Sequence, residues 1–380
     1  MNTINFNVGE NNCYFDYKNL ALKIGEHKID FNIIESNEKS RLYLIFSKTC
    51  NLCCDYCFQK NDDKRINAIE KSTRIYEILD QVIDKYDDIV LFGGEPLLET
   101  NYKIIENIFF KYPHKDYIIF SNGTFEKSYI HLLEKYRKSI KGIILTLDGP
   151  KATHDLVRYN FKNGKKEGTY KVIVENAKKL VDGGINCEIQ INCTLNNLNK
   201  IDDMLEELSR EFLDEVMTIM LNPVKYSEYD LKHIDLLKLY IRNKHKYENL
   251  NICINSRLAN NLNSIITEKK YDNRRCNVDN TMIIDFSTGK VYKCPQNENS
   301  MIGKICDDSI EYYPKTEDEY SLKSNYKNDE CKECGLNKFC YFGCANNKND
   351  YSLCKQEVLS NLEYAFEHFE SLFELEENYE

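Results

Sequence analysis

Residues 49–58 of the 380-residue chain read TCNLCCDYCF, directly after a strand-like run, RLYLIFS. This order predicts a cysteine-bearing loop at the carboxyl end of a β-strand. Cys50, Cys54 and Cys57 form a C-x3-C-x2-C set. Three thiolates hold three irons of a [4Fe–4S] cube and leave the fourth iron open to an external ligand. The alternatives are a zinc knuckle and a chance cysteine-rich loop.

Strand-like and helix-like segments alternate from this loop onward. Strands are expected at 41–47, 88–92, 116–121, 142–147, 186–195 and 216–221. Helices are expected near 68–86, 100–111, 126–139, 169–182 and 198–211. The repeated β-then-α order implies a parallel sheet with right-handed crossovers. Six such units suit a partial (β/α)6 barrel of the α/β class, although periodicity alone fits a doubly wound sheet equally well.

Polar motifs stand where the next predicted strands end: GGEP after the second, SNGT after the third and TLDGP after the fourth, followed by HDLVR. They supply the candidate site residues Gly93, Gly94, Glu95, Pro96, Ser121, Asn122, Thr146, Asp148 and Arg158. Active sites of barrels are built at the carboxyl ends of their strands. Each motif alone is ordinary turn chemistry, but their order after the cysteine loop favours one shared site.

Five segments are expected along the chain. Residues 1–40 form a β-hairpin-like extension, 41–225 the barrel, 226–275 a helical linker, 276–354 a cysteine-rich domain with little regular structure, and 355–380 a C-terminal helix. The cysteine-rich domain shows little hydrophobic periodicity, so it needs crosslinks such as metal sites to stabilise its fold.

A second cysteine pattern, in this domain, offers the ligands for such metal sites. It reads C-x12-G-x4-C and then C-x2-C-x5-C-x3-C-x9-C. Its seven cysteines are Cys276, Cys294, Cys331, Cys334, Cys340, Cys344 and Cys354. Seven thiolates are one short of the eight that two four-iron cubes take. Two four-cysteine zinc sites are the alternative.

Composition limits the function. The chain has 16 cysteines and a formal net charge of −10. The acidic balance argues against a protein that simply binds nucleic acid. No apolar run approaches the roughly 18 residues that span a membrane, and the N-terminal residues MNTINFNVGE lack the charged-then-apolar pattern of a secretion signal. We therefore expect a cytoplasmic protein with neither a nucleic-acid nor a membrane partner, in which the cysteines ligate metal rather than form disulfides.

The two cysteine patterns and the strand-end motifs resemble the radical S-adenosylmethionine superfamily, and within it the SPASM branch, from about residue 41 to 354. The resemblance implies three [4Fe–4S] clusters, one that binds S-adenosylmethionine at Cys50, Cys54 and Cys57, and two auxiliary clusters. It assigns Cys276, Cys294 and Cys344 to the first auxiliary cluster, and Cys331, Cys334, Cys340 and Cys354 to the second. It also implies contacts to S-adenosylmethionine from Tyr56 and from the strand-end residues named above. The general base stays unknown.

The same resemblance implies the chemistry. Reductive cleavage of S-adenosylmethionine gives a 5′-deoxyadenosyl radical, which abstracts hydrogen from a ribosomal precursor peptide. The missing eighth cysteine predicts an open site on the first auxiliary cluster, which suits a substrate cysteine and a thioether crosslink. Alternatives are formylglycine formation by a sulfatase-maturating enzyme, other crosslinks, epimerisation, and a non-catalytic zinc or iron–sulfur scaffold. Pro295 and Gln296 offer no base beside Cys294, which weighs against formylglycine formation.

Three kinds of partner follow from this reading. They are a cysteine-containing precursor peptide, a flavodoxin- or ferredoxin-like reductant, and a separate leader-recognition protein. The 40 residues before the first barrel strand leave little room for a complete recognition domain, so the alternatives to a separate protein are a truncated N-terminal element and recognition by the barrel itself.

Overall fold

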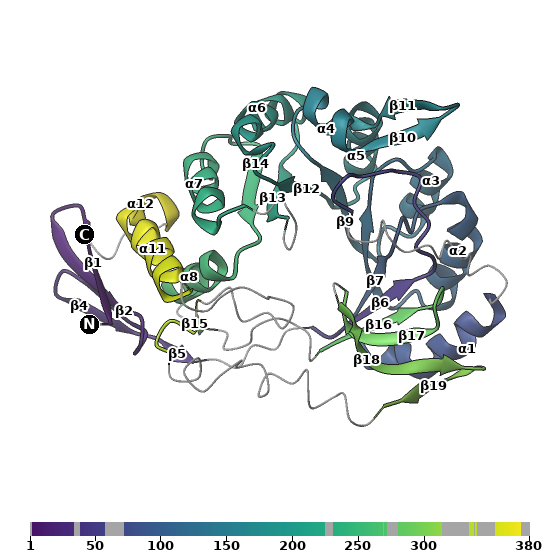
Figure 1. Ribbon diagram of the computed structural model, residues 1–380, viewed down its shortest axis with the longest axis horizontal. Helices are drawn as coiled ribbons and strands as arrows, with labels where there is room; N and C mark the ends of the chain where they lie inside the picture. The colour runs from purple at the N-terminus through teal and green to yellow at the C-terminus, as the bar shows by residue number, and fades with distance from the viewer. Residues whose placement is uncertain are drawn as a thin grey trace.

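The computed structural model describes residues 2–33, 39–57, 72–224, 231–268, 270–271, 280–295, 297–313, 334–337, 339 and 354–373. Its main feature is an 11-stranded sheet in the order β14-β13-β12-β9-β8-β7-β6-β16-β17-β18-β19. The strands from β14 to β16 in that order pair in parallel, and the last three pair antiparallel. The parallel part curves into an arc with helices on its outer side (Figure 1).

The parallel strands are β6 (Arg41–Ile45), β7 (Asp88–Phe92), β8 (Asp116–Ser121), β9 (Ile140–Leu147), β12 (Cys187–Cys193), β13 (Met217–Pro223), β14 (Leu250–Ile254) and β16 (Thr281–Asp285). The antiparallel extension consists of β17 (Lys290–Cys294), β18 (Asn297–Cys306) and β19 (Ser309–Tyr312).

The helices that accompany the sheet are α1 (Ser72–Val82), α2 (Tyr102–Lys111), α3 (Lys127–Lys135), α4 (Lys151–Val157), α5 (Tyr170–Asp182), α6 (Ile201–Glu211), α7 (His233–Asn243) and α8 (Arg257–Glu268). Short 3-10 turns occupy Ile83–Lys85, Glu99–Asn101 and Leu198–Lys200. Helix α6 shows why these segments are helical: Ile201, Met204, Leu205 and Leu208 recur at helical spacing and are buried. Asp202 in its first turn complements the helix dipole.

All six predicted barrel strands are present, and they belong to a larger sheet than we expected. Strand β14 lies inside the segment that we predicted to be a helical linker. Strands β16 to β19 lie inside the segment predicted to have little regular structure, and β16 pairs directly with β6. All five residues of β16 are buried. The sheet therefore continues through the border expected at residue 276.

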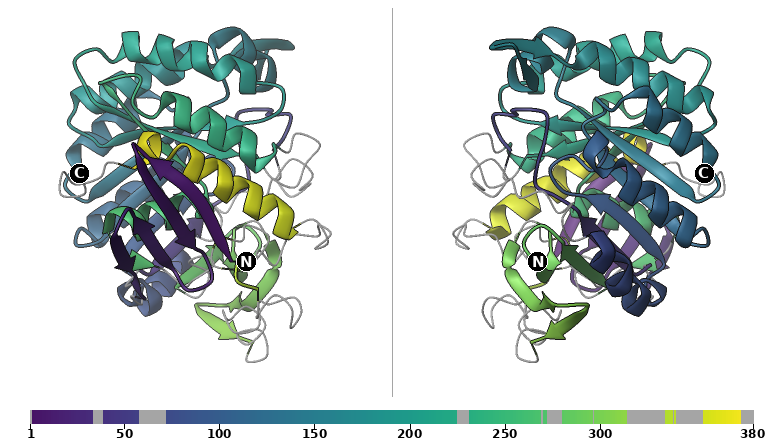
Figure 2. Two further views of the ribbon diagram at one scale, coloured as in Figure 1. Left: turned by 90° about the vertical axis from the view of Figure 1, so that its left-hand side faces the viewer. Right: turned by 90° about the vertical axis from the view of Figure 1, so that its right-hand side faces the viewer.

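The N-terminal residues form more than the expected hairpin. Strands β1 (Thr3–Val8), β2 (Asn11–Asp16), β3 (Ala21–Ile24) and β4 (His27–Asp30) make an antiparallel meander. It packs on the C-terminal helices α11 (Cys354–Glu367) and α12 (Phe369–Leu372), as both views of Figure 2 and Figure 1 show. The ring of Phe366 lies 4.8 Å from that of Phe6 and 4.7 Å from that of Phe15.

Two smaller pairings complete the fold. Strand β5 (Asn32–Ile33) pairs in parallel with β15 (Lys270–Tyr271). Strands β10 (Tyr159–Lys162) and β11 (Lys165–Gly168) form a hairpin after α4. Within the described ranges, no helix combines the length and the apolar character needed to cross a lipid bilayer.

Candidate functional site

The cysteine loop leaves the carboxyl end of β6 and docks on the segment after α4. The backbone N–H of Cys53 donates to the carbonyl of Tyr159 at 2.9 Å, and that of Asp55 donates to the carbonyl of Val157 at 3.2 Å. These bonds hold the loop beside Arg158. The sequence analysis did not foresee this support, because it uses only backbone groups.

The three predicted cluster thiols share this loop. Burial is the main cause that raises the pKa of the Cys50 thiol to about 11, and the negative charge of Glu95 is the second cause. Part of the residue nevertheless reaches solvent. Burial raises the pKa of Cys54 to about 12, and charges on Cys50 and Cys57 add to this. Thiols in this state keep their protons until a metal displaces them, so metal loading releases protons to the solvent. In the described part of the chain, no three His, Cys, Asp or Glu side chains converge as a ready-made metal site.

Two glycines bring the loop after β7 against the start of the cysteine loop. Gly94 N–H donates to the carbonyl of Ser47 at 3.2 Å, and Glu95 N–H donates to that of Thr49 at 2.9 Å. A Cβ on Gly94 would stand 2.3 Å from the Thr49 carbonyl oxygen. Gly93 has a φ of +133°, a conformation that side chains disfavour. The glycines of the GGEP motif are therefore needed for close backbone approach.

Replacing Gly94 with alanine is expected to destabilise the chain by about 1–3 kcal/mol, because the new methyl group overlaps backbone atoms that hold the cysteine loop. Chemical unfolding under anaerobic conditions measures the loss. Gly142→Ala is the matched control, since its Cβ would meet nothing nearer than 3.5 Å. Equal stability of the two variants would show that the close approach does not matter.

The Glu95 carboxylate ties the β7 and β8 ends together. Its Oε1 accepts from Ser121 Oγ at 2.8 Å and from Leu97 N at 2.9 Å, and its Oε2 accepts from Asn122 N at 2.6 Å. Asn122 Nδ2 in turn lies 3.6 Å from Cys50 Sγ, where it donates. Glu95 is 2% exposed, and burial raises its pKa while these donors oppose the rise. The carboxylate is thus already occupied as a brace, and Asn122 carries the connection to the cysteine loop.

Tyr56 stands at the centre of a buried polar network. Its hydroxyl donates to Asp148 Oδ2 at 2.5 Å and accepts from Arg158 Nη1 at 2.8 Å and Asn192 Nδ2 at 2.9 Å. Arg158 Nε lies 3.6 Å from the same Asp148 oxygen. The positive charge of Arg158 lowers the pKa of Cys54 against the effect of burial. Three predicted residues thus meet beside the cysteine loop, together with Asn192, which the motifs did not reveal.

Unsatisfied polar atoms surround this network. Ser47 Oγ, Thr49 Oγ1, Asp148 Oδ1 and Arg158 Nε are buried and accept or donate no hydrogen bond among the described residues. Buried polar atoms rarely stay unpaired. Hydroxyl, carboxylate and guanidinium groups suit a polar, zwitterionic ligand, and the three thiols suit an iron–sulfur cube with one open iron. The residues present therefore fit both the cluster and S-adenosylmethionine.

His154 positions the network without belonging to it. Its Nδ1 accepts from the Asp148 backbone N–H at 3.2 Å, which assigns the proton to Nε2, 3.0 Å from Thr169 Oγ1. That hydroxyl donates to the carbonyl of Arg158 at 3.1 Å. One imidazole thus joins the backbone of Asp148 and, through Thr169, that of Arg158.

Burial lowers the pKa of His154 from 6.5 to about 3. In the unfolded chain the imidazole binds a proton below about pH 6.5, whereas the folded chain excludes that proton until near pH 3. Its contribution to stability is therefore complete above pH 6.5 and is lost as the pH falls toward 3. We expect the free energy of unfolding to fall by on the order of 1 kcal/mol per pH unit in this window. His154→Gln should flatten the profile measured by urea unfolding, and exposed His131→Gln should not.

The remaining predicted residues are placed as follows. Pro96 is buried after β7, where its carbonyl accepts from Asn101 at 3.0 Å. Thr146 lies two residues before Asp148 on β9, in register with Gln190. Cys294 ends β17, and its charge contributes to raising the pKa of Tyr43 on β6, after burial as the main cause. Cys334 likewise contributes to the raised pKa of Tyr17 beside the N-terminal sheet. Cys276, Cys331, Cys340 and Cys344 lie outside the described residues, as does the side chain of Cys354.

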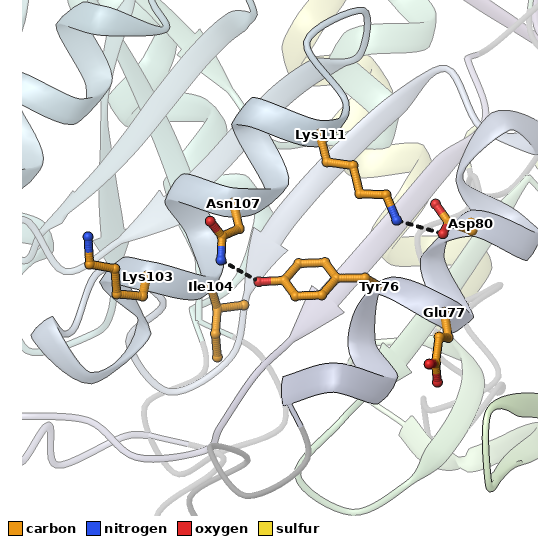
Figure 3. Close-up of a pocket in the computed structure, with 7 residues that line it drawn as sticks. All are labelled: Tyr76, Glu77, Asp80, Lys103, Ile104, Asn107 and Lys111. Carbon is orange, nitrogen blue, oxygen red and sulfur yellow. Dashed lines mark hydrogen bonds and ion pairs between the residues drawn. The ribbon is translucent and has the colours of Figure 1, made fainter.

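One hollow of the described surface lies on the outer helical layer, away from this site. It measures about 390 Å³ and opens between α1 and α2 (Figure 3). Asn107 Nδ2 donates to Tyr76 OH at 3.1 Å across it, and Lys111 pairs with Asp80 at 2.6 Å. Two of the polar pairs that line this hollow thus already bind each other, and no residue of the cysteine loop or of the Tyr56 network lines it, so it is not the candidate site.

Comparison with known proteins agrees with this geometry. Residues 44–208 match the model of the radical SAM superfamily. Among solved structures, anSMEcpe with bound AdoMet aligns with a TM-score of 0.62 and 18% identity, covering 89% of this chain and 96% of that one. Its complex with AdoMet and the Cp18Cys peptide aligns with a TM-score of 0.60, 18% identity and coverage of 87% and 98%. SuiB of Streptococcus suis bound to precursor peptide SuiA aligns with a TM-score of 0.59 and 19% identity, covering 90% of this chain and 94% of that one.

No curated protein matches the chain in sequence. The solved structures share the fold, and the domain match covers the strands and loops that carry the cysteine loop, the Glu95 brace and the Tyr56 network. Residues 44–208 of this chain thus form a radical SAM domain.

Proposed function

We propose that the chain is a radical SAM maturase of the SPASM type that modifies a peptide, and that it forms a thioether crosslink from a cysteine of that peptide. The observation that carries the proposal is the meeting of Tyr56, Asp148 and Arg158 beside the thiols of Cys50 and Cys54. A polar ligand placed there would lie next to the open iron of a cluster on the loop.

Each group of residues has a task in this proposal. Cys50, Cys54 and Cys57 would hold a [4Fe–4S] cluster, and this cluster would supply the electron for the reductive cleavage of S-adenosylmethionine. Arg158, Asp148 and the hydroxyls of Ser47 and Thr49 offer partners for the polar groups of S-adenosylmethionine, because each has an unsatisfied buried atom. Tyr56 fixes the positions of the arginine and the aspartate.

The peptide part of the proposal has two supports. Solved structures with the same fold include complexes with the Cp18Cys peptide and with precursor peptide SuiA. In this chain, Cys294 stands close enough to Tyr43 on the inner side of β6 to affect its pKa. A cluster ligated by Cys294 would therefore adjoin the inner face of the sheet, where a substrate cysteine could bind it.

The two described auxiliary cysteines have different surroundings. Cys294 is on the main sheet, and its N–H donates to Ser300 Oγ at 3.0 Å. Cys334 packs against the core near the N-terminal meander. This separation supports two auxiliary clusters, with Cys294 on the first and Cys334 on the second.

The test is incubation of the anaerobically reconstituted enzyme with S-adenosylmethionine, a strong reductant and cysteine-containing peptides. A thioether removes one hydrogen from carbon and one from sulfur, so the product is lighter by two hydrogens and no longer reacts with thiol reagents. Conversion of the thiol to an aldehyde would instead identify formylglycine formation. Peptides that return unmodified while S-adenosylmethionine is cleaved would contradict the maturase assignment.

A further inference from the structure

Strand β12 presents a polar row on the inner face of the sheet. Cys187, Ile189 and Ile191 alternate with Glu188 and Gln190, and only the first set is fully buried in the helix-covered core. Asn192 continues the polar row and reaches Tyr56. Cys187 and Cys193 share the opposite face, which packs on helices rather than lining the barrel interior.

Glu188 is the charged member of that row. Register places it beside Ile144 on β9 and Thr218 on β13, which carry no charge. Continuing across the sheet, Ile144 is in register with Phe120, whose ring lies 5.7 Å from that of Phe92. The neighbours of Glu188 across the sheet are thus apolar on the β9 side and uncharged on the β13 side.

The Glu188 carboxylate has no hydrogen bond or ion pair with any described residue. Burial is the one cause that raises its pKa, and no neighbouring charge opposes it. A carboxylate that has lost part of its hydration is costly unless a cation or donors compensate it. Glu188 is partly buried. The fully buried acids Asp285 and Asp148 have such partners: Asp285 faces Lys48 at 3.7 Å, and Asp148 faces Arg158.

The position of Glu188 relates it to the candidate site. Four residues along one strand separate it from Asn192 on the same face, which corresponds to about 13 Å at ~3.3 Å per residue. A lysine or arginine carries its charge at the end of a long stem. Such a side chain would reach Glu188 while its peptide backbone lies nearer the Tyr56 network. A peptide amino terminus has no stem to cover this distance.

We propose that Glu188 is a specificity subsite that binds a lysine or arginine side chain of the peptide substrate. The inference rests on the proposed peptide-modifying function and adds to it the charge class of a substrate residue. The ammonium or guanidinium group supplies the partner that the carboxylate lacks within the protein.

The test uses the full-length reconstituted enzyme and a set of synthetic cysteine-containing peptides that differ at one position, which is lysine, arginine, norleucine or glutamate. Norleucine keeps the length of lysine without its charge. Mass analysis gives the rate of modification, and fluorescence anisotropy of labelled peptides gives binding. The wild type is expected to favour the lysine or arginine peptide over norleucine by about tenfold, which corresponds to ~1.4 kcal/mol.

Glu188→Gln should abolish this preference, and Glu188→Lys should transfer it to the glutamate peptide. Glu215→Gln, at an exposed loop position, should retain the wild-type preference. Modification of all four peptides at equal rates by the wild type would overturn the subsite and leave the maturase function standing. Failure to modify any peptide would overturn the maturase function and the subsite with it.

Discussion

Replacing Cys50, Cys54 and Cys57 together with alanine is expected to remove about four of the roughly twelve irons that three cubes contain. The three thiols are the protein ligands of one cluster, and the loop that bears them is held by backbone bonds to Val157 and Tyr159. The fold should therefore persist while the catalytic cluster is lost. Iron and labile sulfide analysis after anaerobic reconstitution measures the change.

Cys253→Ser is the control for this triple variant. Its thiol is half-buried on β14 and contacts Asn251, and it belongs to neither cysteine pattern. It should keep the full iron content. A triple variant that retains as much iron as the control would contradict the assignment of the loop as a cluster site. Zinc without labile sulfide in the unmodified protein would favour the zinc alternative.

The second large effect is expected from Arg158→Met. Methionine fills a similar volume but leaves the buried Asp148 carboxylate without its cation. Removal of one partner from a buried ion pair costs about 3–5 kcal/mol, because the remaining charge stays uncompensated. Anaerobic urea unfolding should show a loss of this size. Arg158→Lys should lose less, since it restores the charge but not the planar donor that reaches both Tyr56 and Asp148.

Arg210→Met provides the matched surface comparison. Arg210 pairs with Glu206 one turn away on α6, and the arginine side chain is 71% exposed. Exposed pairs of this spacing contribute about 0.3–0.5 kcal/mol. A loss for Arg158→Met no larger than that for Arg210→Met would show that the Tyr56 network does not depend on the arginine.

The sequence predicted the barrel strands well because their signal is local. The strand at 116–121 matches β8, and the helix at 169–182 matches α5 within a residue. Strands β14 and β16 escaped prediction for different reasons. The first alternates in burial but is only five residues long and lies between helices, whereas all five residues of the second are buried, so it shows no alternation. Their strand character comes from pairing with β13 and β6.

The residues of the candidate site that belong to sequence motifs were predictable. The residues whose role depends on contacts with distant parts of the chain were not. Tyr56, Asp148 and Arg158 stand in motifs, and the structure brings them together. Asn192 gave one signal that could have revealed it, a polar side chain near the end of a strand with buried isoleucines at 189 and 191. Thr169 gave none, because its role depends on the hydrogen bond from His154 across the fold.

The most direct test of the central claim is reductive cleavage of S-adenosylmethionine by the anaerobically reconstituted chain. With a strong reductant, the wild type should convert S-adenosylmethionine to methionine and 5′-deoxyadenosine, quantified by liquid chromatography and mass spectrometry. The triple cysteine variant should form neither above background. Absence of 5′-deoxyadenosine from a wild-type sample that holds its full complement of iron and sulfide would contradict the account.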